Sequence, residues 1–308
     1  MTAMSPGRAA RRIAHGASVA LCCTLLAGCG LTRPTAAEVG GVAISRAELE
    51  TTLADLATVG QGSLVGGVAP GDSLRGVLTA LIEAEVTRQL LIARGEAVTN
   101  ADRAAARAAM EAGGQFGSAP AHLETLVLDI NAALTARARL TPPPEAEMRA
   151  AYASRPASLG ALCLRHLVVG SRTRARELRA RVLAGASFAE IAAAHSEEPA
   201  AAGTGGALGG ASGDCLSLRE MWSSFDRDFN AGALRARPGT PSEPVRTSFG
   251  WHLIWVRPYD EVADDLRALA ASDAGAVLLD GLLATSDISV ASGYGRWDPA
   301  VGRVEPNT

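Results

Sequence analysis

The spacing of apolar residues changes twice along this chain of 308 residues, near Ala161 and again near Pro258. On either side, residues 73–95 and 261–284 carry the apolar stripe of an amphipathic helix, with Leu, Val and Ile recurring at three and four residues. Between the two changes, strand-like and helix-like segments alternate around an antiparallel hairpin. The sequence therefore predicts an α+β unit, a small antiparallel sheet with surrounding helices, inserted into an α-helical domain.

The helical flank before Ala161 is expected to contain several helices. Ser45 is a plausible N-cap, and Glu48 three residues later completes the capping-box pattern. Further helices are predicted over residues 101–114, 122–140 and 145–154. The helix over 261–284 is expected to pack back on this flank, and residues 286–308 to form an irregular tail.

The α+β segment has its own order of elements. A strand is predicted over residues 163–169, followed by helices over 173–185, 187–196 and 226–236. The stretch EPVRTSFGWHLIWV, residues 243–256, predicts two more strands joined by a tight corner at Phe249-Gly250. It also places His252 inside a strand, where an imidazole must find hydrogen-bond partners or destabilise its surroundings.

The N-terminus has the pattern of a targeting segment. Three arginines precede an apolar stretch over residues 17–28 that is too short to span a bilayer. Leu26, Ala27 and Gly28 then precede Cys29, which resembles a bacterial lipoprotein signal and implies lipidation of the Cys29 thiol. The alternative is an ordinary secretory signal. The expected location is extracytoplasmic, with the chain tethered to the cell membrane through its acylated N-terminus.

Net charge and cysteine content limit the possible functions further. Without residues 1–28 the chain keeps 26 arginines, no lysine and 32 acidic residues, a net charge of −6, which argues against a nucleic-acid partner. Only Cys163 and Cys215 then remain as possible free thiols. In an oxidising compartment a disulfide between them is predicted, and two buried reduced thiols are the alternative.

Several spaced motifs follow one another in a fixed order within residues 161–257. They are Arg165-His166, Phe188-Ala189-Glu190, the run 196–199, the glycine-rich run 205–209, Pro238-Gly239 and the segment 242–252. Together they resemble a parvulin-type peptidyl-prolyl isomerase domain, and the lipoprotein signal with the flanking helices resembles extracytoplasmic foldases of the PrsA and SurA type. The domain boundaries expected on this basis are a signal peptide at 1–28, a lipid-anchored linker at 29–36, a SurA-N-like helical chaperone domain at 37–155, the isomerase domain at 159–258, and a C-terminal helix and tail at 259–308 that pack on the helical domain.

The resemblance assigns roles to individual residues. It makes His166 and His252 a pair at the floor of the site, with Thr247 hydrogen-bonded beside them and Glu198 where the family usually has Asp or Cys. Substrate binding falls to the apolar residues Leu208, Phe225 and Phe229, which would receive the proline ring, and to Phe249. The run 210–224 is longer than the family's loop at this place and is expected to border the pocket.

The implied function is cis–trans isomerisation of X–Pro bonds in unfolded or newly exported polypeptides. It is non-covalent, because the enzyme needs only to bind the twisted amide better than either planar form. No cofactor and no metal are expected, since the histidines lack ligand spacing and cysteine partners. The alternatives are a parvulin-fold holdase with a weak or silent site, a structural envelope lipoprotein, and a phosphate-directed isomerase that uses Arg172, Arg174 and Arg176.

Overall fold

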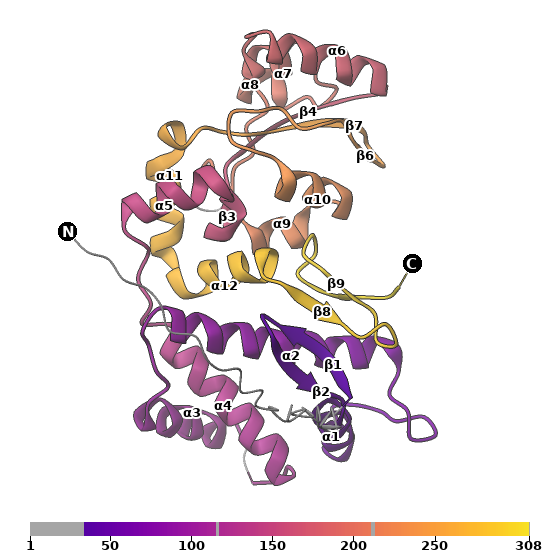
Figure 1. Cartoon of the computed structure of the whole chain (residues 1–308), viewed down its shortest axis with the longest axis vertical. Helices are drawn as coiled ribbons and strands as arrows, with labels where there is room; N and C mark the ends of the chain where they lie inside the picture. The colour runs from indigo at the N-terminus through magenta and orange to yellow at the C-terminus, as the bar shows by residue number, and fades with distance from the viewer. Residues whose placement is uncertain (1–33, 115–116, 211–212, 308) are drawn as a thin grey trace, which may run out of the picture. The chain divides into compact units, whose positions relative to one another are not determined.

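The computed structural model describes residues 34–114, 117–210 and 213–307 (Figure 1). The predicted signal peptide and the lipidation site Cys29 lie outside these residues. Helices and small antiparallel sheets make up the described chain, so the predicted α+β class is confirmed. The predicted insertion is confirmed as well, because the first and last parts of the described chain pack into one core and the α+β elements lie between them in sequence.

The helical region is built from both ends of the described chain. Its core gathers Leu78, Ile82 and Leu90 together with Leu279 and Leu283 from near the C-terminus. The elements of the N-terminal part are β1 (Thr35–Val39), β2 (Val42–Ser45), α1 (Arg46–Thr58), α2 (Gly71–Ala93), α3 (Asn100–Ala112), α4 (Ala121–Arg137) and α5 (Glu145–Ser154). As predicted, Ser45 caps α1 by accepting a hydrogen bond from the Glu48 N–H at 3.1 Å.

The prediction of an irregular C-terminal tail is wrong. The tail forms three short strands, β8 (Ile288–Val290), β9 (Arg296–Asp298) and β10 (Arg303–Glu305). β8 adds to the β1–β2 hairpin in the order β2-β1-β8, so the tail returns to the first described strand. Strands of three residues are too short to show an alternating pattern, and their partners lie far away in sequence, so no local signal marked them.

The prediction of a single helix over residues 261–284 is also wrong. Two helices, α11 (Tyr259–Ser272) and α12 (Ala274–Thr285), meet at Asp273 with a bend of 106°. Asp273 has a non-helical backbone, and its carboxylate accepts a hydrogen bond from the Ala276 N–H at 2.9 Å. An aspartate in this conformation is a helix N-cap, which starts a new helix instead of continuing the old one. In the described part of the chain no single helix is long and apolar enough to span a membrane. Only α11 and α12 taken together have the required length and hydropathy, and they form a bent pair.

The inserted region is centred on a three-stranded antiparallel sheet in the order β4-β7-β6. Leu167, Val169 and Leu253 point to the face covered by α6 and α7, and alternate residues point to the face covered by α10. The elements are η1 (Pro156–Leu159), β3 (Ala161–Leu162), β4 (Leu164–Val169), α6 (Arg172–Leu183), α7 (Phe188–His195), α8 (Ala201–Thr204), β5 (Leu216–Ser217), α9 (Leu218–Ser224), α10 (Arg227–Arg235), β6 (Val245–Thr247) and β7 (Gly250–Val256).

A close approach joins the inserted region to the helical region. Gly160 has a positive φ of 73°, and a Cβ at this position would lie 1.7 Å from the Val277 carbonyl oxygen of α12. Only glycine fits both the left-handed backbone and this contact. The start of the inserted region is therefore held directly against α12.

The run 210–224, expected as a long loop, folds at its C-terminal end into β5 and α9. Ser217 and Glu220 form a capping box, in which the Ser217 oxygen accepts from the Glu220 N–H and the Glu220 carboxylate accepts from the Ser217 N–H. Arg219 on α9 then pairs with Asp280 of α12 at 2.5 Å. This segment connects the inserted region to the helical region.

The predicted disulfide between Cys163 and Cys215 is present, and both residues are fully buried. It closes a loop with a sequence separation of 52. Replacing both cysteines by alanine is expected to lower the free energy of unfolding by about 3–4 kcal/mol, because the cross-link restricts the unfolded chain. Urea unfolding of the variant and of the wild type checks this. A variant with the midpoint of the oxidised wild type would contradict it, and wild type unfolded with a reducing agent serves as the control.

Candidate active site

Two histidines meet on the α10 face of the sheet. His166 on β4 pairs in register with Ile254 on β7, and His252 on β7 pairs with Val168, so the two side chains are offset by two residues on one face. Their Nδ1 atoms lie 3.3 Å apart, their rings are nearly parallel, and the two residues are only 7% and 6% exposed. The structure thus brings the two predicted histidines together.

Hydrogen bonds extend from this pair in both directions. His166 Nε2 lies 2.5 Å from the Glu198 carboxylate, and His252 Nε2 lies 2.8 Å from Thr247 Oγ1. Thr247 Oγ1 in turn accepts a hydrogen bond from the Phe249 N–H at 3.1 Å. Thr247 closes the β6–β7 hairpin opposite Gly250, which places its hydroxyl beside the strand that carries His252.

One arrangement of protons satisfies every contact of this network. A carboxylate can only accept, so neutral His166 carries its proton on Nε2 and its Nδ1 is an acceptor. His252 then donates from Nδ1 to His166, and its Nε2 accepts from the Thr247 hydroxyl. The network therefore runs as one chain of donors from the Phe249 N–H to the Glu198 carboxylate, and it fixes the tautomer of each histidine.

Burial keeps both histidines neutral at neutral pH. The pKa of His252 is lowered to about 4, mainly by burial and also by the neighbouring His166, while the charge of Asp226 acts in the opposite direction. Burial also lowers the pKa of His166, and the Glu198 carboxylate opposes that shift by its charge and its hydrogen bond. In both cases the loss of water around a charged imidazole outweighs the nearby negative charge.

Aromatic rings cover the histidine pair. Phe229 on α10, 2% exposed, meets both imidazoles edge to face, with ring centroids 5.5 Å from His166 and 5.4 Å from His252. Phe225 stacks on Phe229 at 5.2 Å, and it and Leu208 are partly buried hydrophobic residues packed against the same core. The predicted residues Phe229 and Phe225 thus lie against the pair as a stack of two rings, and Leu208 belongs to the same core.

Comparison with known proteins decides the identity of this region. The family model of the rotamase, or PPIC-type PPIase, domain matches residues 170–257. These residues are a PPIC-type peptidyl-prolyl isomerase domain. The family resemblance in the sequence is confirmed. The matched range contains Glu198, Thr247 and His252, while His166 lies four residues before it, on the strand paired with β7.

Curated relatives carry chaperone and foldase names. Chaperone SurA of Aromatoleum aromaticum is 42% identical over 106 residues, which are 34% of this chain and 22% of that protein. Foldase protein PrsA of Clostridium kluyveri is 33% identical over 118 residues, 36% of this chain and 33% of that protein. The match thus spans no more than a third of the length of either relative. A solved structure, PrsA from Bacillus subtilis, is 17% identical over 81% of this chain and 90% of that chain, with a TM-score of 0.29.

Phe249 does not join the buried part of the isomerase domain. Its side chain is 78% exposed at the tip of the β6–β7 hairpin, and only its backbone N–H enters the network, through Thr247. Two arginines of the phosphate-directed alternative make contacts within the domain. Arg172 lies over the Trp251 ring, and Arg174 pairs with Glu177.

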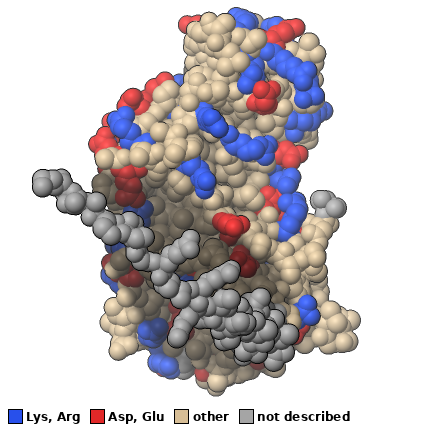
Figure 2. Space-filling view, viewed as in Figure 1, with Lys and Arg blue, Asp and Glu red and all other residues tan. Residues whose placement is uncertain are grey.

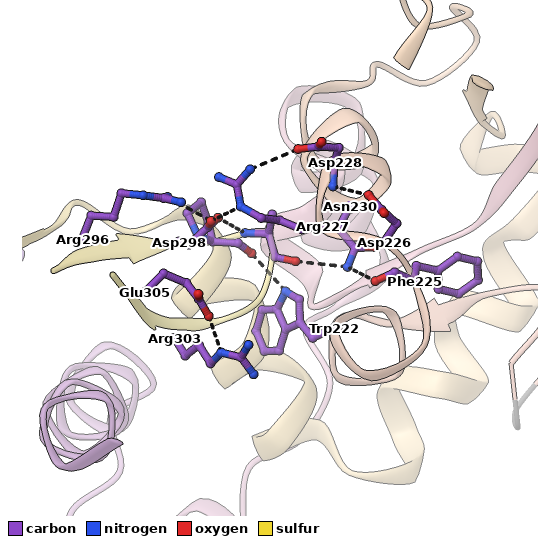
Figure 3. A network of polar contacts seen from close by, with 12 residues as sticks. Trp222, Phe225, Asp226, Arg227, Asp228, Asn230, Arg296, Asp298, Arg303 and Glu305 are labelled. Carbon is purple, nitrogen blue, oxygen red and sulfur yellow. Dashed lines mark hydrogen bonds and ion pairs between the residues drawn. The ribbon is translucent and has the colours of Figure 1, made fainter. Parts of the chain in front are cut away.

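A polar network from the C-terminal tail holds α10, the helix that carries Phe229, in place (Figure 3). The Asp298 carboxylate, 2% exposed, accepts from Arg227 on α10 and from Arg296. Asn230 donates to the Met221 and Ala300 carbonyls at 3.0 and 3.1 Å. Trp222 on α9 donates to the Pro299 carbonyl at 3.0 Å. The isomerase domain is therefore braced by residues outside the matched range.

Sequence reasoning missed Asn230 and Asp298 as positioning residues. The spaced motifs of the family stop before the tail, and an aspartate in a three-residue strand has no distinctive local pattern. The one usable signal in this region was the Ser217–Glu220 spacing, which predicts a helix start just before Arg219 and Trp222.

Proposed function

We propose that the protein is a foldase that isomerises X–Pro bonds in unfolded or newly exported polypeptides outside the cytoplasmic membrane. One observation carries the proposal: His166 and His252 are buried, neutral and bonded to each other under Phe229. The names of the relatives, chaperone and foldase, support a polypeptide substrate. The disulfide supports an oxidising compartment, and the proposed anchor is a lipid on Cys29.

The proposed chemistry is non-covalent. Rotation about an X–Pro bond faces a barrier of about 18–20 kcal/mol because the planar amide is stabilised by resonance. Phe229, Phe225 and Leu208 offer an apolar surface for the proline ring, and removing water from the amide weakens that resonance. Both nitrogens of each histidine are already bonded within the network, so the pair serves as a rigid neutral floor and does not bond the substrate.

Glu198 supplies the charge in this proposal. Its side chain is 38% exposed, and it is the end of the donor chain, so one carboxylate oxygen remains available at the surface of the site. Resonance in the planar amide places negative charge on the carbonyl oxygen, and twisting the bond removes it. A carboxylate near that oxygen therefore disfavours the planar form more than the twisted one, which lowers the barrier.

Replacing Glu198 by glutamine is expected to lower kcat/KM for isomerisation about 10-fold, because the field at the rotating carbonyl is lost. A set of X–Pro tetrapeptides with the full-length protein provides the measurement. Glu197→Gln is the matched control, since Glu197 is the adjacent glutamate and bonds the Gly170 N–H instead of a histidine.

The outcomes separate the mechanism from the function. Acceleration by the wild type together with equal activity of both variants would reject the role of Glu198 and keep the isomerase. No acceleration of any peptide by the wild type would reject the isomerase.

A second candidate function is a holdase, and one feature of the helical region favours it. A concave surface of ≈ 720 Å³ lies there, lined by apolar residues of β2, α2 and α4 with charged residues among them. Ile92 and Leu134 on this surface are 63% and 41% exposed. Such a surface suits apolar segments of an unfolded chain. Suppression of client aggregation without any isomerisation would establish this function in place of the first.

A further inference from the structure

A second concave surface lies between α10 and the edge strand β6, next to the isomerase site. Its volume is ≈ 650 Å³, and it is lined by α10, by the segment 236–244 and by β6. α10 carries Phe229 and β6 carries Thr247, so the two elements that form this surface also form the active site. None of the four proposed network residues or of the apolar site residues lines it.

Arginines dominate the charge of this surface. Arg227, Arg235, Arg237 and Arg246 line it, with Asp228 and Glu243 as the acidic residues. Arg227 is neutralised by Asp298 and Asp228, and Glu243 is neutralised by Arg179 at 2.9 Å. Figure 2 shows blue side chains gathered where α10 and β6 lie.

Three guanidinium groups are left over. Within the described chain, Arg235, Arg237 and Arg246 are exposed and form no ion pair with a carboxylate. Arg246 lies over the Trp251 ring at 5.7 Å, which orients its side chain but does not neutralise it. A chain with net charge −3 thus keeps three uncompensated positive charges around one hollow. Such a local field attracts anionic groups.

We propose that this arginine groove, the hollow between α10 and β6 lined by Arg227, Arg235, Arg237 and Arg246, binds an acidic segment of the polypeptide whose proline occupies the active site. The inference rests on the proposed isomerase function and adds a charge preference to it. Guanidinium groups bind carboxylates through paired N–H donors, so aspartate and glutamate side chains are the groups that fit.

The shape favours a polypeptide over a membrane surface. The groove is concave, and small or apolar residues line it together with the arginines, among them Ala231, Gly232, Pro241 and Val245. A flat layer of lipid headgroups cannot enter a hollow of this kind, whereas an extended chain can. A substrate held at the active site by its proline also brings its flanking residues to the elements that line the groove.

The test compares two labelled peptides with the full-length protein. Each carries Ala-Pro at its centre, flanked on both sides by three glutamates in one peptide and by three glutamines in the other. Fluorescence anisotropy is expected to show about 10-fold tighter binding of the glutamate peptide in about 50 mM salt, and most of this difference should disappear in about 300 mM salt.

Variants locate the effect in the groove. Arg235→Gln with Arg237→Gln is expected to weaken binding of the glutamate peptide about 5-fold, as two partly exposed ion pairs are lost. Arg176→Gln removes one exposed arginine on α6, outside the groove, and is expected to leave the affinity unchanged. Arg235→Gln and Arg237→Gln are also measured singly, because each removes one positive charge, as Arg176→Gln does.

Three results would overturn the proposal. The first is equal affinity for both peptides, and the second is equal weakening of binding by Arg176→Gln and by the groove variants. A third is weaker binding of the double variant to phosphatidylglycerol vesicles with unchanged binding of the glutamate peptide, which would assign the groove to lipid headgroups. Isomerisation of the glutamine peptide by the wild type is measured separately. Its absence counts against the isomerase function, and its presence with any of these results counts against the groove alone.

Discussion

Replacing Phe229 by alanine is expected to lower the free energy of unfolding by about 3–4 kcal/mol and to abolish isomerisation. The Phe229 ring is 2% exposed and contacts His166, His252 and Phe225, so its removal leaves a cavity at the centre of the site. The imidazoles would lose the apolar cover that keeps them neutral. Urea unfolding measures the stability, and the tetrapeptide assay measures the activity.

Two further variants separate folding from catalysis. Phe225→Ala removes the same ring from a partly exposed position, and it is expected to cost about half as much stability because less surface was buried. Phe229→Leu fills most of the cavity and should stay folded while it loses the edge-to-face contacts and most of the activity. A loss of less than about 1 kcal/mol for Phe229→Ala, or full activity of Phe229→Leu, would contradict the central role of this ring.

The family resemblance predicted the histidine pair, and the geometry of the strands explains why the two residues meet. Thr247 and His252 lie on the two strands of one tight hairpin, so the corner at Phe249-Gly250 fixes their separation. His166 lies far away in sequence, but it sits on a strand whose alternation puts every second side chain on the same face as His252. Strand period and hairpin register together determine which residues meet.

The direction of the Phe249 side chain could not be predicted from the sequence. Its position at the corner follows from the sequence, but which way the ring points depends on what packs against the hairpin. In the structure the ring is exposed, and the backbone N–H makes the useful contact.

The rest of the fold was missed where partners are distant or elements are short. β8 pairs with β1 across most of the chain, and neither strand is long enough to show its period. The break at Asp273 was missed because the apolar stripe continues through it, while one capping aspartate changes the direction of the chain. Tertiary contacts decide such points, and a periodicity argument does not contain them.

The extra run before Phe225 has a structural role that its length alone did not reveal. Its helix α9 makes two contacts: Arg219 forms an ion pair with Asp280 of α12, and Trp222 donates a hydrogen bond to the Pro299 carbonyl in the C-terminal tail. The cysteine that precedes α9 is cross-linked to Cys163 beside β4. The insertion therefore fastens the isomerase domain to the helical region.

The stability of the protein is expected to depend on pH through His252. The pKa of His252 is about 4 in the folded protein, below its usual value of 6.5. Between these values the unfolded chain binds more protons than the folded one, so the free energy of unfolding rises with pH. The contribution of His252 is complete above pH 6.5 and is lost as pH falls to 4. This change amounts to about 3 kcal/mol, and His166, whose pKa is also lowered, adds to it in the same direction.

His252→Gln provides the comparison, because glutamine keeps a donor and an acceptor but does not titrate. The carboxylates that titrate in this range are shared by both proteins, so their effects largely cancel in the difference. The stability advantage of the wild type over His252→Gln should shrink by about 3 kcal/mol between pH 7 and pH 4, measured by urea unfolding at each pH. Parallel curves for the two proteins, or an NMR titration of the His252 ring with a midpoint above pH 6, would show that the imidazole is not held neutral by burial.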